Sequence, residues 1–384
     1  MNVYPMSVYP LNLIALDGGR VIKKGGASGG GGASVPEDNA PLYIEALTDI
    51  TITFGNTHEY SKDNIVWSSG TSSTSVSASA GEKVYYRATG LTATSSAGIG
   101  AFTISGKCNV GGNIMSMLYG TNFKGKESLT QSYSFFKLFG SQPIESAKNL
   151  CLPATALADN CYDRMFYGCT SLVTAPNLPA TTLAKYCYQY MFSGCTSLVT
   201  APSLPATTLA DRCYYSMFRG CTSLVTAPTL PATTLADRCY YSMFHDCTSL
   251  VTAPALPATT LAIYCYAYMF YGCTSLVTAP ALPATTLASY CYQYMFYGCT
   301  SLVNAPALPA TTLAVYCYER MFYGCKKLQY IKAMFIALPG STYTSNWVTG
   351  VASQGTFVKN SAATWSVTGV SGIPSGWSVQ TASA

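Results

Sequence analysis

The chain repeats a 26-residue phrase seven times between Asn160 and Cys325, within a sequence of 384 residues. One copy, from Cys169 to Gly194, reads CTSLVTAPNLPATTLAKYCYQYMFSG. A fixed period between about 20 and 50 residues is typical of proteins in which each unit buries its apolar face against the next. The period therefore predicts a solenoid over about half of the protein. Solenoids mainly present surfaces, so we expect display before catalysis.

Within each unit, apolar residues recur at the same offsets. In one unit they are Leu172, Leu178, Leu183, Cys187, Met191, Phe192 and Cys195. From Leu183 to Cys195 the steps are four residues, which predicts one face of a short helical or 3₁₀ segment. The run from Leu172 to Ala175 is predicted as a short strand. Pro176 and Pro179 end it, because proline cannot donate to a ladder with neighbours on both sides.

The spacing C-x-x-L, LP, L, MF-x-x-C resembles the BspA-type leucine-rich repeats, whose units end in an AF-x-x-C step. This sequence differs by a longer unit and by Met where that family usually has Ala. The resemblance covers roughly residues 135–330. It implies a leucine-rich-repeat fold and a broad role in adhesion or binding.

The flanking segments complete a predicted α+β multidomain chain. Residues 1–24 are apolar and are predicted to attach the protein to a partner, although a disordered tail is the alternative. The glycine-rich residues 25–40 are predicted as a flexible linker. Residues 41–108 alternate between apolar and polar positions, with Gly, Asn and Ser at the turns. That pattern predicts an Ig-like β-sandwich.

In this sandwich one layer is predicted to contain Ile50, Ile52 and Phe54, facing a second layer of Val84, Tyr86 and Ala88. We expect it to act as a spacer; sugar binding through Trp67 or Tyr85 is the alternative.

The repeat block is predicted to have atypical ends, because the last unit of a solenoid exposes core unless it is capped. Residues 109–150 are predicted as an N-terminal cap, 151–330 as the solenoid and 331–384 as a small β-rich C-terminal cap. The cap contains Trp347, Trp365 and Trp377, for which an aromatic binding platform is the alternative.

Charge and hydropathy exclude two classes of partner. Between Cys151 and Cys325 six Lys or Arg residues balance six Asp or Glu residues, so the repeats lack the basic stripe that nucleic-acid binding needs. No segment approaches the ~18 apolar residues of a membrane helix. The N-terminus lacks a basic region and contains prolines, which predicts that no secretory signal is cleaved. The thirty tyrosines are predicted to form contact surfaces.

Fourteen of the sixteen cysteines form two ladders, at 26-residue steps from Cys161 and from Cys169. Neighbouring rungs could form disulfides, but seven rungs would leave one thiol over in each ladder. We therefore expect reduced thiols that fill the core as small hydrophobes. Zinc is not expected, because eight-residue separations do not match structural sites.

Catalytic groups are scarce. His58 is predicted to lie in a turn and His245 at an exposed, accidental position. No Ser/His/Asp or Cys/His set recurs, and there is no phosphate-binding glycine motif. We expect no enzymatic activity, no cofactor and no metal.

Differences between coils concentrate at five places, which are Lys185, Tyr186, Gln189, Tyr190 and Ser193 in one unit. The exposed threonines hardly change, so localised change suggests a surface selected for recognition; simple tolerance of substitution is the alternative. Tyrosine suits such surfaces because it offers area and a hydroxyl at low entropic cost. The predicted recognition residues are Lys185, Tyr186, Gln189, Tyr190, Arg212, Tyr215, Arg238, Tyr241, Tyr264, Tyr268, Tyr290, Tyr294, Tyr316 and Arg320.

The layout of a short N-terminal segment, glycine linker, sandwich, repeats and closing segment resembles proteins carried by phages and prophages of gut anaerobes. This resemblance implies a receptor-binding or tail-associated protein at the virion surface, held by other virion proteins through residues 1–24. Its partner would be a host cell-surface glycan or protein, and a homo-oligomer is allowed. The alternatives are a bacterial cell-surface adhesin and a structural decoration protein of the virion.

Overall fold

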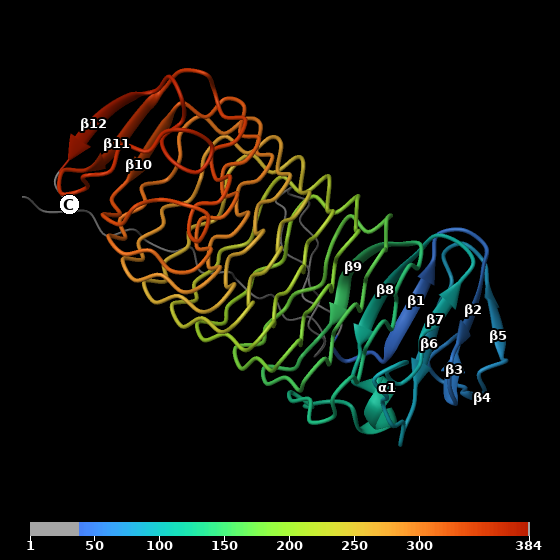
Figure 1. Ribbon diagram of the computed structural model, residues 1–384. Coiled ribbons are helices and arrows are strands. Elements are labelled where there is room, and N and C mark those ends of the chain that lie inside the picture. The colour runs from blue at the N-terminus through green and yellow to red at the C-terminus, as the bar shows by residue number, and fades with distance from the viewer. Residues whose placement is uncertain (1–37, 383–384) are drawn as a thin grey trace, which may run out of the picture. The chain divides into compact units, whose positions relative to one another are not determined.

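The computed structural model describes residues 38–382, which begin with two β-sheets. The elements of this part are β1 (Leu42–Ala46), β2 (Ile50–Phe54), β3 (His58–Ser61), β4 (Ser68–Gly70), β5 (Ser75–Ala78), β6 (Lys83–Arg87), β7 (Phe102–Ile104), β8 (Cys108–Asn113), α1 (Ser116–Tyr119), the 3₁₀ helix η1 (Gly120–Asn122) and β9 (Ile144–Cys151). The large sheet has the order β4-β3-β6-β1-β8-β9, and the small sheet has the order β5-β2-β7 (Figure 1).

The two sheets bury the side chains that the alternation predicts. Ile50, Ile52 and Phe54 are buried in β2, as are Val84 and Tyr86 of β6 with the following Ala88. The rings of Tyr86 and Phe102, from different sheets, have centroids 5.0 Å apart in an edge-to-face arrangement. The predicted inward-facing positions are therefore confirmed.

The large sheet does not end at residue 108, where the sequence predicts a boundary. β8 pairs antiparallel with β1 and parallel with β9, and Ser146 in β9 pairs in turn with Thr174 of the next coil. The backbone ladder thus runs from the sheets into the repeats without a break, because β9 is already the strand position of a coil.

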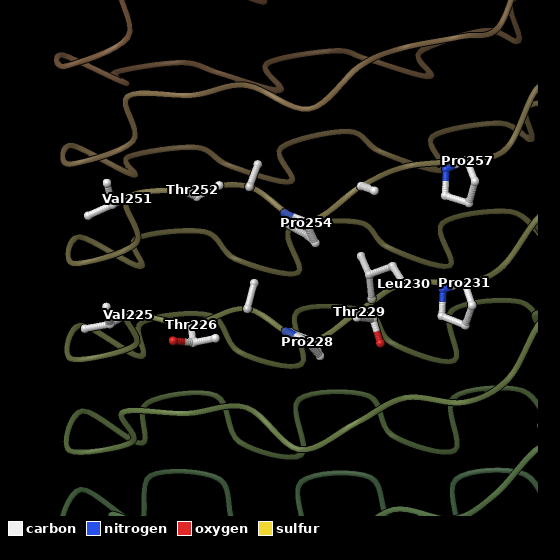
Figure 2. Close-up of a pocket in the computed structure, with 13 residues that line it drawn as sticks. Val225, Thr226, Pro228, Thr229, Leu230, Pro231, Val251, Thr252, Pro254 and Pro257 are labelled. Atoms are coloured by element: carbon white, nitrogen blue, oxygen red, sulfur yellow. The ribbon is translucent and has the colours of Figure 1, made fainter. Parts of the chain in front are cut away.

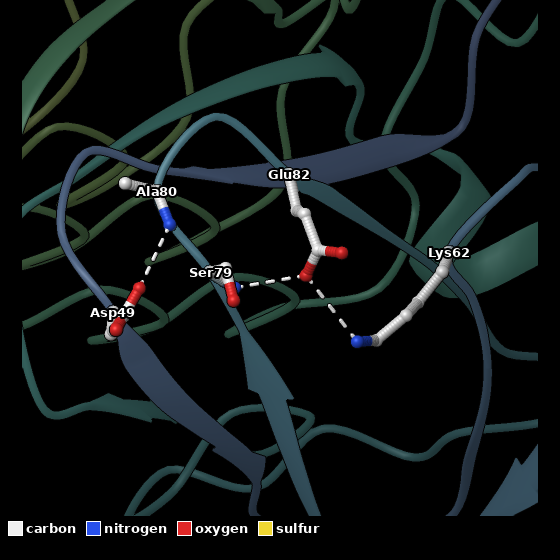
Figure 3. A network of polar contacts seen from close by, with 5 residues as sticks. All are labelled: Asp49, Lys62, Ser79, Ala80 and Glu82. Carbon is white, nitrogen blue, oxygen red and sulfur yellow. Dashed lines mark hydrogen bonds and ion pairs between the residues drawn. The ribbon is translucent and has the colours of Figure 1, made fainter.

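One loop of this part is fixed by carboxylates rather than by packing (Figure 3). Glu82 accepts a hydrogen bond from the amide of Ser79 at 2.9 Å, and Asp49 accepts one from the amide of Ala80 at 3.1 Å. Lys62 lies 3.4 Å from Glu82. The Ser79 amide is the main cause that lowers the pKa of Glu82. These contacts hold the turn between β5 and β6.

The predicted helical segment of each coil is wrong: the described chain has turns there, not a helix. Amides bond alternately in two directions. The amide of Gln189 donates to the carbonyl of Tyr186 at 3.1 Å, whereas that of Tyr190 donates to Tyr215 in the next coil at 2.9 Å. Because every second amide holds the neighbouring coil, the continuous bonding that a helix needs within one segment cannot form.

The four-residue spacing nevertheless matches the structure, because the turns bring buried residues to the interior every four residues. Buried residues come in pairs, Cys187 with Tyr188 and then Met191 with Phe192, separated by partly exposed pairs. Leu183, predicted in the core, is only half-buried against it. The predicted strand at Leu172 is reduced to a single bridge in each coil, such as Thr174 with Thr200.

Stacked rings fill the interior between coils. The tyrosines at 26-residue steps from Tyr162 to Tyr318 are fully buried, with neighbouring centroids 5.6 Å apart at Tyr162–Tyr188 and 6.0 Å apart at Tyr292–Tyr318. A parallel row of phenylalanines stacks beside them, for example Phe166 on Phe192 at 5.6 Å. The expectation that the tyrosines form contact surfaces is therefore wrong for this ladder.

Both cysteine ladders are buried, which confirms that these thiols fill the core. In the second ladder each thiol also has a polar partner. The Cys195 Sγ donates to the carbonyl oxygen of Phe166 at 3.1 Å, and Cys247 repeats the contact with Phe218 at 3.1 Å. Burial raises the pKa of Cys169 to about 12, so the thiol stays protonated and able to donate.

The coil geometry extends beyond the predicted solenoid in both directions. The amide of Phe135 donates to Cys161 at 2.8 Å, and that of Phe322 donates to Trp347 at 2.8 Å, in the same pattern as the central coils. The strands β10 (Tyr330–Ala333), β11 (Thr356–Asn360) and β12 (Ser378–Ala382) then form a parallel sheet (Figure 1).

Residues predicted as possible binding groups near the C-terminus are enclosed instead. Trp347 is fully buried, and Trp365 and Trp377 are 5% and 7% exposed. An aromatic binding platform built from these rings is therefore ruled out. They pack in the apolar core at this end of the coils. Of the predicted N-terminal segments, residues 1–24 and most of 25–40 lie outside the described residues.

Within residues 38–382, no helix has the length and apolar character needed to cross a membrane.

Candidate recognition face

The predicted recognition residues all lie on the turn segments. We call this set of fourteen side chains the variable face. Lys185 is exposed, and the other thirteen are partly exposed; none belongs to the buried core. They are half-covered because they lean on one another from coil to coil.

The backbone holds many of these side chains in an unusual conformation. Tyr186 has φ 59°, Tyr190 has φ 51° and Arg212 has φ 51°, and the same holds at the matching positions of the later coils. This left-handed region favours glycine and asparagine, and a bulky residue there costs on the order of 1–3 kcal/mol. The third such position of most coils is indeed glycine, as at Gly194. The chain therefore retains tyrosine and arginine where glycine or asparagine would be less strained.

Tyrosine rings of the variable face stack along the coils. The centroids of Tyr264 and Tyr290 are 4.3 Å apart with an interplanar angle of 11°, and Tyr316 continues the row at 5.2 Å. A second row places Tyr268 on Tyr294 at 4.5 Å.

Further contacts join the rows into one surface. The rings of Tyr215 and Tyr241 lie 4.7 Å apart, Tyr241 contacts Tyr268 at 5.2 Å, and Tyr190 contacts Tyr215 at 5.5 Å. The structure thus brings most of the predicted residues together.

This stacking changes what the surface can bind. The sequence suggested that Tyr264, Tyr290 and Tyr316 could stack on sugar rings. In the structure their ring faces are largely occupied by each other, so the surface presents ring edges and hydroxyl groups. A partner would therefore meet rows of phenol hydroxyls running from coil to coil.

Arginines continue the rows where tyrosine is absent. The guanidinium of Arg238 lies 4.6 Å from the ring centroid of Tyr264, and that of Arg320 lies 5.3 Å from Tyr294. Arg212 covers Tyr186 at 5.2 Å and also pairs with Asp211 at 3.1 Å. Cation–π contacts of this kind hold the side chains in place while leaving charge at the surface.

Two predicted residues stand apart from the rings. Lys185 precedes Tyr186, and its amide donates to the Asp159 carboxylate at 2.9 Å. Gln189 precedes Tyr190 and is partly exposed beside it.

Two phenols of this surface have a raised pKa. Burial, followed by the neighbouring Tyr241 and Tyr294, raises the pKa of Tyr268. Burial, followed by Tyr190 and Tyr241, likewise raises the pKa of Tyr215. These hydroxyls can therefore both donate and accept hydrogen bonds at ordinary pH.

A third row of rings lies outside the predicted variable face. His245, Tyr271, Tyr297 and Tyr323 follow one another at 26-residue steps, with ring centroids 4.4, 4.5 and 4.7 Å apart. They occupy the offset of Ser193, which is one of the five variable places, so the spacing alone could have identified them. His245 is correspondingly half-buried and lies 3.0 Å from Asp246, and is not the free surface residue that was expected.

The other histidine is also placed differently from the prediction. His58 begins β3 and is buried, with its Nδ1 2.9 Å from the carbonyl oxygen of Asn56. No group of three or more His, Cys, Asp or Glu side chains that could hold a metal ion occurs among residues 38–382.

Comparison with known families identifies the repeats. The model of the BspA type leucine rich repeat region matches residues 144–251 and 240–337, in six copies. Together the matches cover half of the chain. The protein belongs to the BspA-type leucine-rich repeat family. BspA-type repeats indicate a surface or protein-interaction role. No curated protein and no solved structure matches the chain.

Proposed function

We propose that this BspA-type repeat protein is a non-enzymatic recognition protein, and that its variable face binds a glycan or protein on a host cell surface. One observation carries the proposal. Side-chain variety between coils is concentrated on the turn segments that carry the stacked rows, with one further variable position at Asn177, whereas the exposed threonine and valine positions hardly change. Tolerance of substitution would have spread differences over both.

The backbone conformation supports selection over tolerance. Positions such as Tyr264 and Tyr290 have φ 57° and 61°, where glycine or asparagine would be favoured. Retaining tyrosine and arginine at such positions opposes stability, so their side chains must contribute something else. Stacked rings with few free rotamers make a rigid, pre-organised contact surface.

In this proposal the protein works at the virion surface as a phage receptor-binding or tail-associated adhesin. The stacked coils serve as a leucine-rich-repeat solenoid, the two-sheet part as an Ig-like spacer, and β10–β12 as part of a C-terminal cap. Residues 1–24 would attach the protein to other virion proteins. A bacterial cell-surface adhesin would use the same face.

The test compares cell binding by the full chain and a triple variant. Fluorescently labelled protein is applied to a panel of gut anaerobic bacteria, with Y264A/Y290A/Y316A beside the wild type. We expect the triple variant to lose at least tenfold in binding, because it removes the three stacked tyrosines of one row. Y330A is the matched control, since Tyr330 is 37% exposed but begins β10.

Circular dichroism and thermal unfolding establish that both variants remain folded. Unchanged cell binding by a folded triple variant would contradict the proposal and favour a structural decoration role. Attachment is tested separately by deleting residues 1–24, which should abolish incorporation of the protein into particles.

A further inference from the structure

A second surface of the coils keeps the same residues from coil to coil, whereas the residues of the variable face differ. The stretch from Cys169 to Ala184 contains no charged residue, and its counterparts in the following coils contain none either, up to the one that begins at Cys299. Its exposed valines are Val173, Val199, Val225, Val251 and Val277, which are 43–50% exposed. We call these valines, with the exposed threonine that follows each of them and the second proline of each coil, the valine face.

The coil does not need these valines for its own core. Leu172 and Leu178 on either side are buried, whereas Val173 and Thr174 between them are exposed. These exposed positions nevertheless keep valine and threonine from coil to coil, which their own coil does not require. Contiguous exposed apolar surface of this extent is typical of an interaction site.

The valine face has ridges and hollows at the spacing of the coils. Figure 2 shows Val225, Thr226 and Pro231 in one row and Val251 and Pro257 at the same places in the next. A hollow of about 550 Å³ lies between these rows, lined only by uncharged residues. Thr174 pairs with Thr200, and Thr200 with Thr226, so neighbouring rows keep one register.

We propose that the valine face is a dimer interface, and that its occupant is a second copy of this chain. The rows of the valine face repeat at the coil spacing, about 4.8 Å. The partner surface that fits this spacing best is an identical set of rows on a second copy. Valine ridges of one copy can then enter hollows of the other, as in an isologous interface. The absence of charge on this face removes the complementarity that a basic or acidic partner would require.

The available area agrees with a dimer. The exposed valines, threonines and second prolines of five consecutive coils present on the order of 800 Å², which is what each partner of a standard interface buries. The valine face comes from a different part of each coil than the variable face. This inference therefore stands whether or not the variable face binds a host cell.

Analytical ultracentrifugation of the full chain over a range of concentrations tests the interface. We expect the wild type to form a dimer, and V225E/V251E to raise the dimer dissociation constant at least tenfold, because it buries two carboxylates among apolar side chains. V315E is the matched control, since Val315 is 42% exposed but lies on the turn segment. It should change the constant less than twofold.

V225T/V251T keeps the side-chain shape and serves as a second variant in case the glutamate variant does not fold. It should also weaken the dimer. A wild type that stays monomeric at every concentration would overturn the proposal, as would equal dissociation constants for wild type and both valine-face variants. A monomer that becomes a dimer only after residues 1–24 are deleted would also overturn it, because that segment would then be the occupant.

Discussion

At the scale of single residues, Asp163 stands out because it is a buried carboxylate within a coil. Its side chain is only 3% exposed and lies on the interior side of the coil. Arg164 lies 2.9 Å from it. Burial nevertheless dominates and raises the pKa of Asp163 to about 7 from 3.8, with Arg164 and Lys137 opposing the shift.

This shift predicts a pH dependence of stability. Between pH 4 and 7 the unfolded chain ionises Asp163 more readily than the folded chain does, so the free energy of unfolding falls as pH rises. The loss is at most about 4 kcal/mol for a three-unit shift. Asp163→Asn cannot ionise, so its unfolding midpoint should depend less on pH over this window.

Urea unfolding at pH 4, 5.5 and 7 measures the effect. Asp237→Asn, which alters an exposed carboxylate of a later coil, is the control and should follow the wild type. Parallel pH profiles for Asp163→Asn and the wild type would disprove the assignment.

At the scale of the element, the turn segment depends on a positive φ at every fourth residue. Gly194, Gly220 and Gly272 have φ 78°, 72° and 70°, and Asp246 takes the same place in another coil with φ 59°. A Cβ at Gly220 would meet its nearest neighbour at 3.9 Å, so space is not the constraint there. Conformation alone decides which residue the position accepts.

Gly220→Ala should therefore destabilise the protein by about 1–2 kcal/mol, because alanine is strained at this φ. Gly220→Asn should cost less, since asparagine tolerates the left-handed region. Chemical denaturation gives both values. Gly340→Ala is the control, because a Cβ there meets nothing and φ is not positive. Equal losses for Ala and Asn at position 220 would refute a conformational origin.

At the scale of the whole molecule, stability passes from coil to coil through the stacked interior. Each coil contacts mainly its two neighbours, so the terminal coils have the fewest supports. Trp347 closes one end: its ring centroid lies 6.2 Å from Tyr318, 5.9 Å from Phe335 and 6.1 Å from Phe357. Its indole also donates to the carbonyl of Gly372 at 2.8 Å.

Trp347→Ala should cost about 3–5 kcal/mol, as expected for removing a buried aromatic residue. Hydrogen exchange should rise first in residues 317–382 and remain lower near β9, because support is lost from one end. Trp347→Phe should recover part of the loss. Uniform exchange along all coils would show that the stack unfolds as one cooperative unit.

The period, the buried leucines at the offsets of Leu172 and Leu178, and both cysteine ladders were determined by the sequence alone, because each coil must bury the same volume against similar neighbours. The alternation from β2 to β6 likewise identified inward positions from side-chain polarity. The five variable places, too, could be read from the repeats, including the row of Tyr271 and Tyr297.

Only the tertiary structure decided how the backbone satisfies its hydrogen bonds. Alternate amides such as that of Tyr190 bond to the next coil, and this contact between residues 25 apart cannot be inferred from spacing within one segment. The same stacking buries Tyr188 while leaving Tyr190 at the surface, although both are tyrosines in one segment. It also turns the ring faces of Tyr264 and Tyr290 toward each other, since side chains that repeat at the coil spacing meet only when the coils are stacked.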